Sequence, residues 1–246
     1  MKIISSHFGV HADYNAAALH LIKNNRIDAV SCFAFSERLE KDYHALIRSK
    51  QNNPSLEIGL AFILSSKIFK PLSAHFPNGC FLPHEHFSCN AWLGLLDRDA
   101  LKIELLAQWA AFQEIFGQAP DFIEGWRNIQ NLPQISQIMA EILSEQAFQA
   151  VVLLMKRQYF QFSVSAYQAK KHYQKYQINM EQDICHLTPH LFKRIKQFQA
   201  EKYQQVKLPK IIYTTPRLYK LDEAAINSGS FSACEQFHQL MAMDRL

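Results

Sequence analysis

The start of the chain places residues that can bind or move a proton directly after a short apolar segment. Ile3 and Ile4 are followed by Ser6, His7 and Gly9. The apolar pair predicts a buried strand, and the glycine predicts that this strand opens into a loop. Functional side chains are common at strand ends, and the imidazole of His7 can exchange a proton near neutral pH. Ser6 and His7 are therefore the first candidate residues.

A second group of candidates lies in a long connection over residues 65–98, which we expect to form a rim or lid. This connection contains two cysteines and two histidines close together, namely Cys80, His84, His86 and Cys89. Thiolate and imidazole are ligands that suit zinc. Their C-x3-H-x-H-x2-C spacing is not a standard zinc pattern, however. We therefore expect no metal here and keep a structural zinc site at these four residues as the alternative.

Four segments of the sequence share their order and residue pattern with one known family. The segment from Ile4 to Gly9 resembles N-A-D-D-F-G, and residues 58–64 resemble V-G-L-H-L-T-L. Residues 123–133 resemble I-D-G-H-Q-H-V-H-x-x-P, and residues 211–216 are similar to an M-V-H-P strand. These patterns resemble the YdjC-like carbohydrate deacetylases, the family of the chitooligosaccharide and hopanoid-associated enzymes. The resemblance is good to about residue 155, thin over 156–209 and suggestive beyond.

Most residues that this family uses for chemistry are replaced. The general base falls on Ser6, an aspartate metal ligand on His7, a metal-binding histidine on Ala61, three further histidines on Trp126, Asn128 and Gln130, and the histidine acid on Thr215. The family would use a divalent metal such as zinc or magnesium, and a hydrolytic metal needs several ligands and an open position for water. Among these positions only His7 is a suitable ligand. We therefore expect no metal cofactor.

Glu124 stands where the family keeps an aspartate. The resemblance implies that His7, Ala61 and Glu124 meet at one mouth of a barrel, where Glu124 and His7 could exchange protons with Arg127 as a third catalytic residue. Alternatively, Glu124 pairs with Arg127 or with a backbone donor. The ligand-binding candidates are Ser6, Ala61, Trp126, Asn128 and Thr215. Trp126 would either fill the space of the lost metal site or present an aromatic face to a sugar.

Composition restricts the class of protein. The chain has 246 residues, of which 48% are hydrophobic, and a formal net charge of +4. This charge is too small to imply nucleic acid or a membrane surface as a partner. The five cysteines form no C-x-x-C pair, and no apolar run is long enough to span a bilayer. We expect a cytoplasmic protein with reduced thiols.

Short apolar segments alternate with amphipathic ones over the first two thirds of the chain. This pattern predicts an α/β fold in which helices cover parallel strands. The expected strands are 2–5, 29–35, 56–64, 122–124 and 150–155, and the expected helices are 14–24, 39–51, 100–116 and 134–146, with Asp99 capping the third helix and Gly117 ending it. Together with the family resemblance, this indicates a single-domain (β/α) barrel or distorted TIM-like barrel over residues 1–246.

Three functions follow from this sequence. The first is a degenerate carbohydrate deacetylase homologue that still binds a carbohydrate-like small molecule or a partner protein. The second is a hydrolase that acts on an acylated sugar without a metal, through His7, Glu124 and Arg127. The third is a purely structural or assembly role, as a homo-oligomer or with another protein, in which Trp126 fills the old pocket.

Overall fold

The computed structural model describes residues 1–34, 37–67, 69–76, 79–146, 148–154, 160–187, 191–193, 195, 209–215, 236, 238, 240 and 241. The chain forms two compact units. Unit 1 consists of Met1–Cys32, Glu37–Glu57 and Asp183–Leu246, and unit 2 consists of Phe33–Ser36 and Ile58–Gln182.

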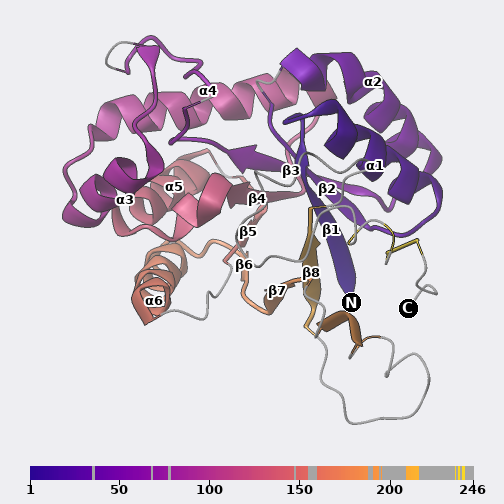
Figure 1. Ribbon diagram of the computed structural model, residues 1–246. Coiled ribbons are helices and arrows are strands. Elements are labelled where there is room, and N and C mark those ends of the chain that lie inside the picture. The colour runs from indigo at the N-terminus through magenta and orange to yellow at the C-terminus, as the bar shows by residue number, and fades with distance from the viewer. Residues whose placement is uncertain are drawn as a thin grey trace. The chain divides into compact units, whose positions relative to one another are not determined.

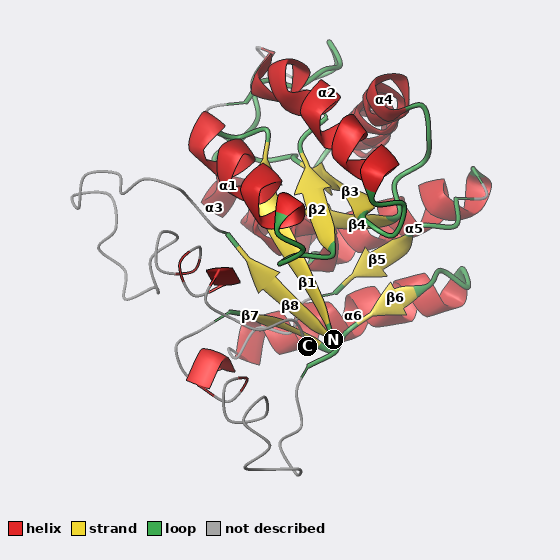
Figure 2. Ribbon diagram, turned by 90° about the vertical axis from the view of Figure 1, so that its right-hand side faces the viewer, coloured by secondary structure: helices red, strands yellow, loops and turns green. Residues whose placement is uncertain are grey.

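Unit 1 contains parallel strands and two helices. Its strands are β1 (Lys2–Phe8), β2 (Ala29–Cys32), β7 (Ile184–His186) and β8 (Ile211–Thr214), and its helices are α1 (Ala12–Lys23) and α2 (Glu37–Asn52). Strand β1 lies between β2 and β8, β7 pairs with the other edge of β8, and each of these pairs is parallel. Helix α1 packs against both α2 and β1 (Figure 2). Parallel strands require crossover connections, which α1 supplies between β1 and β2.

Unit 2 repeats this alternation. Its strands are β3 (Glu57–Phe62, whose first residue belongs to unit 1), β4 (Phe122–Gly125), β5 (Val151–Leu153) and β6 (Met180–Glu181), which pair in this order and in parallel. Its helices are α3 (His84–Leu93), α4 (Arg98–Phe116), the 3-10 helix η2 (Trp126–Asn131), α5 (Pro133–Glu145) and α6 (Phe160–Lys175). Helix α5 packs against α3, α4 and α6 (Figure 1).

An aspartate holds the amino end of a strand in each unit. The carboxylate of Asp28, just before β2, accepts a 2.8 Å hydrogen bond from the backbone N–H of Ile3 in β1. In the same way Asp121, just before β4, accepts a 2.8 Å hydrogen bond from the N–H of Ile58 in β3. Hydrogen bonds to charged groups are stronger than neutral ones. Both pairs therefore fix the start of a strand relative to its neighbour.

The expected strands and helices of residues 1–154 are confirmed with small changes at their ends. Helix α4 ends at Gly117, which takes the left-handed conformation with φ +67°. The prediction that Asp99 caps this helix was wrong: the capping residue is Asp97, whose carboxylate accepts from the N–H groups of Asp99 and Ala100. Capping needs the residue before the first helical turn, and the helix begins earlier than its apolar spacing suggested.

Several elements were not anticipated. The connection over 65–98 contains helix α3, and the segment over 156–209 contains α6, β6 and β7. Asn78 of the expected rim, Met155 and Pro216 lie outside the described residues. Among the helices that the structure describes, none has the length and apolar character needed to cross a bilayer.

Candidate functional site

The end of β1 holds His7 in an unusual backbone conformation. Its φ is 71°, in the left-handed region that costs a residue other than glycine about 1 kcal/mol or more. The pairing of β1 with β2 also shifts register between Ser5 and Phe8, which is where His7 lies. Such irregularities often re-aim a side chain next to a functional site. The backbone therefore sets the direction of the imidazole.

Ser6 fixes the ring of His7. The buried Ser6 Oγ lies 2.5 Å from His7 Nδ1 and donates to the carbonyl oxygen of Thr214 at 3.2 Å. A serine has one hydroxyl proton, so when Ser6 donates to Thr214, His7 Nδ1 is the donor to Ser6. In the neutral ring of this tautomer Nε2 is the acceptor nitrogen, which is the form that a general base requires.

Thr215 follows β8 in the same unit. Its N–H and the hydroxyl of Thr214 both donate to Oε1 of Gln236, at 2.9 Å and 2.7 Å. Ser5 of β1 is the register partner of Thr214. The structure therefore brings Ser6, His7 and Thr215 to neighbouring strand ends.

The loop after β1 is held by residues that the sequence analysis did not single out. The N–H of Gly9, which has φ 93°, donates to Asn15 Oδ1 at 2.7 Å, and the amide of Asn15 donates to the carboxylate of Asp42. Asn15 lies fully buried on α1. An asparagine on the apolar face of a helix was the signal that could have identified it, since a buried amide needs hydrogen-bond partners.

Ala61 and Glu124 are neighbours in unit 2. They are register partners in β3 and β4, so both side chains point to the same face of the sheet. Ala61 is fully buried and Glu124 is 8% exposed. Ala61 has no side-chain atom that could bind a metal. Of this pair, Glu124 therefore supplies the group that can bind a cation or exchange a proton. Since His7 belongs to unit 1, its pairing with Glu124 stays a prediction.

Arg127 interacts with a carboxylate from helix α3. Its Nη1 lies 3.8 Å from Oε1 of Glu85, and both side chains are largely exposed. The pKa of Glu85 is lowered, first by a backbone hydrogen bond at its own residue and to a smaller extent by the charge of Arg127. The carboxylate that the structure records beside Arg127 is thus Glu85.

The residues after β4 form an aromatic contact and a tight backbone turn. The ring of the half-buried Trp126 meets the buried ring of Phe33 edge to face, with 5.4 Å between centroids, and Phe33 stacks on Phe69. Arg127 and Asn128 both take left-handed conformations, with φ 57° and 62°. Trp126 is therefore packed on one edge by Phe33 and exposed in part.

Gln130 connects the ends of two strands. Its Oε1 accepts from the N–H of Gly125 at 3.0 Å, and its Nε2 donates to the carbonyl of Leu153 at 2.7 Å. The side chain is buried. A side chain on Gly125 would come within 2.7 Å of this Oε1, so the contact needs glycine there. Gln130, which stands at a histidine position of the family, holds the end of β4 to β5.

The donor atoms at the family positions do not fit a divalent metal. Apart from His7 and Glu124 these positions offer hydroxyls, a methyl, an indole and amides, and both amide atoms of Gln130 are already bonded. Within the residues that the structure describes, no three histidine, cysteine, aspartate or glutamate side chains are grouped so as to hold an ion. Hard and borderline cations need charged oxygen ligands or imidazoles.

The alternative zinc ligands are arranged as ordinary surface residues. Cys80, His86 and Cys89 are exposed, and His84 lies at the start of α3. The two ring nitrogens of His84 face hydroxyl groups, with Nδ1 3.0 Å from Ser65 Oγ and Nε2 3.4 Å from Ser88 Oγ.

These strands and helices, with candidate residues near the carboxyl ends of the strands, define an α/β protein of the (β/α) barrel class. A solved structure from Enterococcus faecalis V583, for which cellobiose-phosphate cleavage has been proposed, aligns with 97% of this chain and 89% of its own with a TM-score of 0.66. The sequence identity is 14%, so this similarity establishes the fold.

The family follows from the sequence match. The model of the YdjC-like proteins matches residues 7–235, and the chain belongs to this family. A chitooligosaccharide deacetylase of Escherichia fergusonii is 26% identical over 145 residues, which cover 56% of this chain and 53% of that protein. The Yersinia enterocolitica protein of the same name is 31% identical over 111 residues, covering 43% and 41%. The matched region thus spans about half the length of these curated relatives.

Proposed function

We propose that this YdjC-like protein no longer performs metal-dependent deacetylation and binds a carbohydrate-like ligand through the remodelled family positions. The observation that carries the proposal is the bonding of Gln130. A metal ligand needs a lone pair directed at the ion, whereas both polar atoms of Gln130 bond to backbone groups of the neighbouring strand ends. This position now stabilises the fold.

The aromatic residues of unit 2 support the binding part of the proposal. Trp126 is held by Phe33 and remains partly exposed. A rigid, half-exposed indole offers apolar area at a small cost in conformational entropy, together with an N–H donor. The C–H face of a sugar ring matches such a surface. The names of the curated relatives, which refer to a chitooligosaccharide, point to the same class of ligand.

One observation favours a second candidate, a metal-independent hydrolase. His7 is kept in a strained conformation and hydrogen-bonded to Ser6, an arrangement that orients a base. In this alternative His7 activates water for attack on an acylated sugar, and Glu124 and Arg127 assist. A third candidate, a purely structural role, predicts neither binding nor turnover.

The deciding experiment combines metal analysis, an acetate-release assay and a binding titration with di-N-acetylchitobiose. The proposal predicts no stoichiometric metal, no acetate, and a saturable shift of the Trp126 indole N–H resonance that Trp126→Phe removes. Acetate release together with bound metal, both lost in His7→Ala, would overturn it. Turnover without metal that Glu124→Gln abolishes would establish the second candidate, and a complete lack of sugar binding would favour the third.

A further inference from the structure

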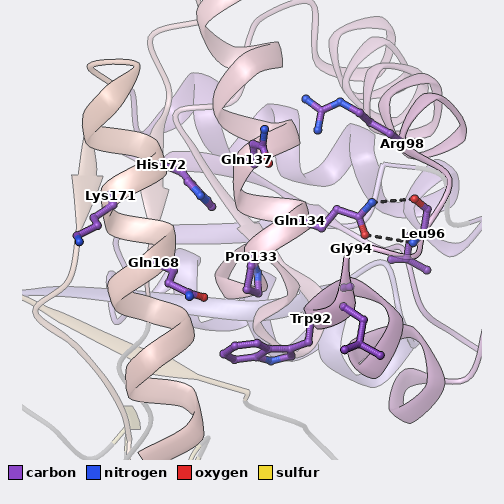
Figure 3. Close-up of a pocket in the computed structure, with 12 residues that line it drawn as sticks. Trp92, Gly94, Leu96, Arg98, Pro133, Gln134, Gln137, Gln168, Lys171 and His172 are labelled. Atoms are coloured by element: carbon purple, nitrogen blue, oxygen red, sulfur yellow. Dashed lines mark hydrogen bonds between the residues drawn. The ribbon is translucent and has the colours of Figure 1, made fainter.

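A pocket of about 570 Å³ lies in unit 2, away from the family positions (Figure 3). Helices α3, α5 and α6 and the segment leading into α4 form its walls. Its volume is within the range of small-molecule sites, which extends over roughly 300–1,000 Å³. Ala61, Glu124, Trp126 and Asn128 contribute nothing to its lining.

One wall of this pocket is an exposed aromatic ring. Trp92, near the end of α3, is 40% exposed, and its indole lies along one edge of the pocket below Pro133 (Figure 3). The wall behind it is rigid, because the side chain of Gln134 bonds to both the N–H and the carbonyl of Leu96, at 3.2 Å and 2.7 Å. The pocket therefore presents a flat apolar face on a fixed frame.

The opposite wall, on α6, presents hydrogen-bond acceptors. The side chain of Gln168 points into the pocket (Figure 3). Its Oε1 is buried, and no donor reaches it within the part of the chain that the structure describes. A buried carbonyl oxygen without a donor is unfavourable, and rotation of the Gln168 amide toward the pocket would let a ligand hydroxyl supply the missing bond.

His172 provides a second acceptor on the same helix. Its Nδ1 lies 2.8 Å from Ser136 Oγ, whose proton is donated to the carbonyl of Pro133 at 2.9 Å. When Ser136 donates to Pro133 in this way, Nδ1 is the protonated nitrogen and Nε2 keeps its lone pair. Burial lowers the pKa of His172, the charge of Lys175 lowers it further, and Glu141 opposes them, so the environment favours the neutral ring.

The cationic side chains of the lining are already engaged. Arg98 forms an ion pair with Glu141, and Nζ of Lys171 lies 4.7 Å from the centroid of the Tyr167 ring. The pocket thus offers a flat aromatic face and acceptors for hydroxyl groups, without a charge directed at its contents.

We propose that this pocket is a second carbohydrate site that binds a short neutral saccharide, with a sugar ring on Trp92 and its hydroxyls donating to Gln168 and His172. The site is separate from the family positions and does not depend on the function proposed for them.

The test follows the indole N–H resonances of the three tryptophans while cellobiose and di-N-acetylchitobiose are added separately, with Trp→Phe variants for assignment. The Trp92 resonance should shift and saturate with at least one of the sugars. Gln168→Leu should weaken this binding by about tenfold, the effect of one lost hydrogen bond to a buried acceptor. Leu95→Ala is the matched control, because Leu95 is 68% exposed beside Trp92 but lies outside the pocket lining.

Three outcomes of this titration would overturn the proposal: no shift of the Trp92 resonance, the same affinity in Gln168→Leu as in the wild type, or weaker binding in Leu95→Ala. A separate titration with glucose and glucose 6-phosphate tests whether the pocket prefers a neutral sugar. Tighter binding of glucose 6-phosphate would overturn the proposal as well. Weaker binding in Leu95→Ala would indicate that the sugar contacts the exposed apolar end of α3 and lies outside the pocket. A shift confined to the Trp126 resonance would overturn this second site and support the function proposed for the family positions. A shift confined to the Trp92 resonance would support the second site and count against sugar binding at the family positions.

Discussion

Gln130, which the resemblance places at a histidine position of the family, takes part in holding a sheet together. Its two amide atoms bond to the N–H of Gly125 and to the carbonyl of Leu153. In addition, the hydroxyl of the buried Tyr173 donates to the backbone carbonyl of Gln130 at 3.2 Å. The residue is therefore embedded in contacts from β4, β5 and α6.

Replacing Gln130 by leucine should lower the free energy of unfolding by about 3 kcal/mol, since two buried backbone groups each lose a partner. Urea denaturation measures this change. Gln137→Leu is the control, because Gln137 is exposed and its amide bonds to Glu141; it should change stability by about 0.5 kcal/mol or less. Equal stability of the two variants would contradict the role assigned to Gln130.

His172 makes the stability of the protein depend on pH, and the direction of its pKa shift sets the sign of this dependence. Its pKa is lowered from 6.5 in the folded state, mainly by burial. The unfolded chain therefore binds more protons, so stability is fully present above pH 6.5 and falls as the pH decreases toward the folded-state pKa. Urea midpoints on both sides of pH 6.5 should show a smaller decrease in His172→Gln than in the wild type. An unchanged decrease would mean that other groups cause the loss.

At the scale of elements, one glutamate anchors the segment between β3 and α3. The fully buried carboxylate of Glu104 on α4 accepts from the N–H groups of Leu72 and Ser73, at 3.1 Å and 2.8 Å, and from the amide of Gln108 at 2.8 Å. Gln108 in turn bonds to the N–H and carbonyl of Ile63, just after β3. This network fixes the segment to α4.

Glu104→Gln should release this segment, because an amide has one acceptor oxygen where the carboxylate has two and turns N–H groups toward backbone donors. Limited chymotrypsin digestion should then cleave near the exposed Leu72 severalfold faster than in the wild type. Glu145→Gln is the control, since Glu145 makes a partly exposed ion pair with Lys102. The same cleavage rate in all three proteins would show that other contacts hold the segment.

Element types were predictable where the apolar pattern is long. Helices α1, α2, α4 and α5 and strands β1 to β5 lie near their expected positions. Strands β6 and β7 have two and three residues, too few to show an alternation. Helix α3 buries only Phe87 and Ala91, so its apolar stripe is weak. At the site the replaced residue types were evident, but the contact of Gln130 with Leu153 comes from a distant strand and has no local signal.

At the scale of the whole molecule, the residue types at the family positions predict that the stability of the folded protein does not depend on a bound metal. A metal that binds only the folded state would raise its stability, and a chelator would remove that gain. We expect the same thermal midpoint with and without EDTA. A lower midpoint in EDTA that added zinc restores would contradict this expectation, and repeating the measurement with His7→Ala would then show whether His7 is a ligand.

The aspartate contacts at the amino ends of β1 and β3 have an evolutionary consequence. Asp28 and Asp121 hold the amino end of one strand in each unit, whereas the positions that the resemblance assigns to the family's chemistry lie toward the carboxyl ends of the strands. Substitutions at the carboxyl ends of the strands therefore leave the hydrogen bonds of Asp28 and Asp121 unchanged. A lineage can lose its ancestral reaction in several steps while every intermediate still folds, which leaves time for selection on a different ligand.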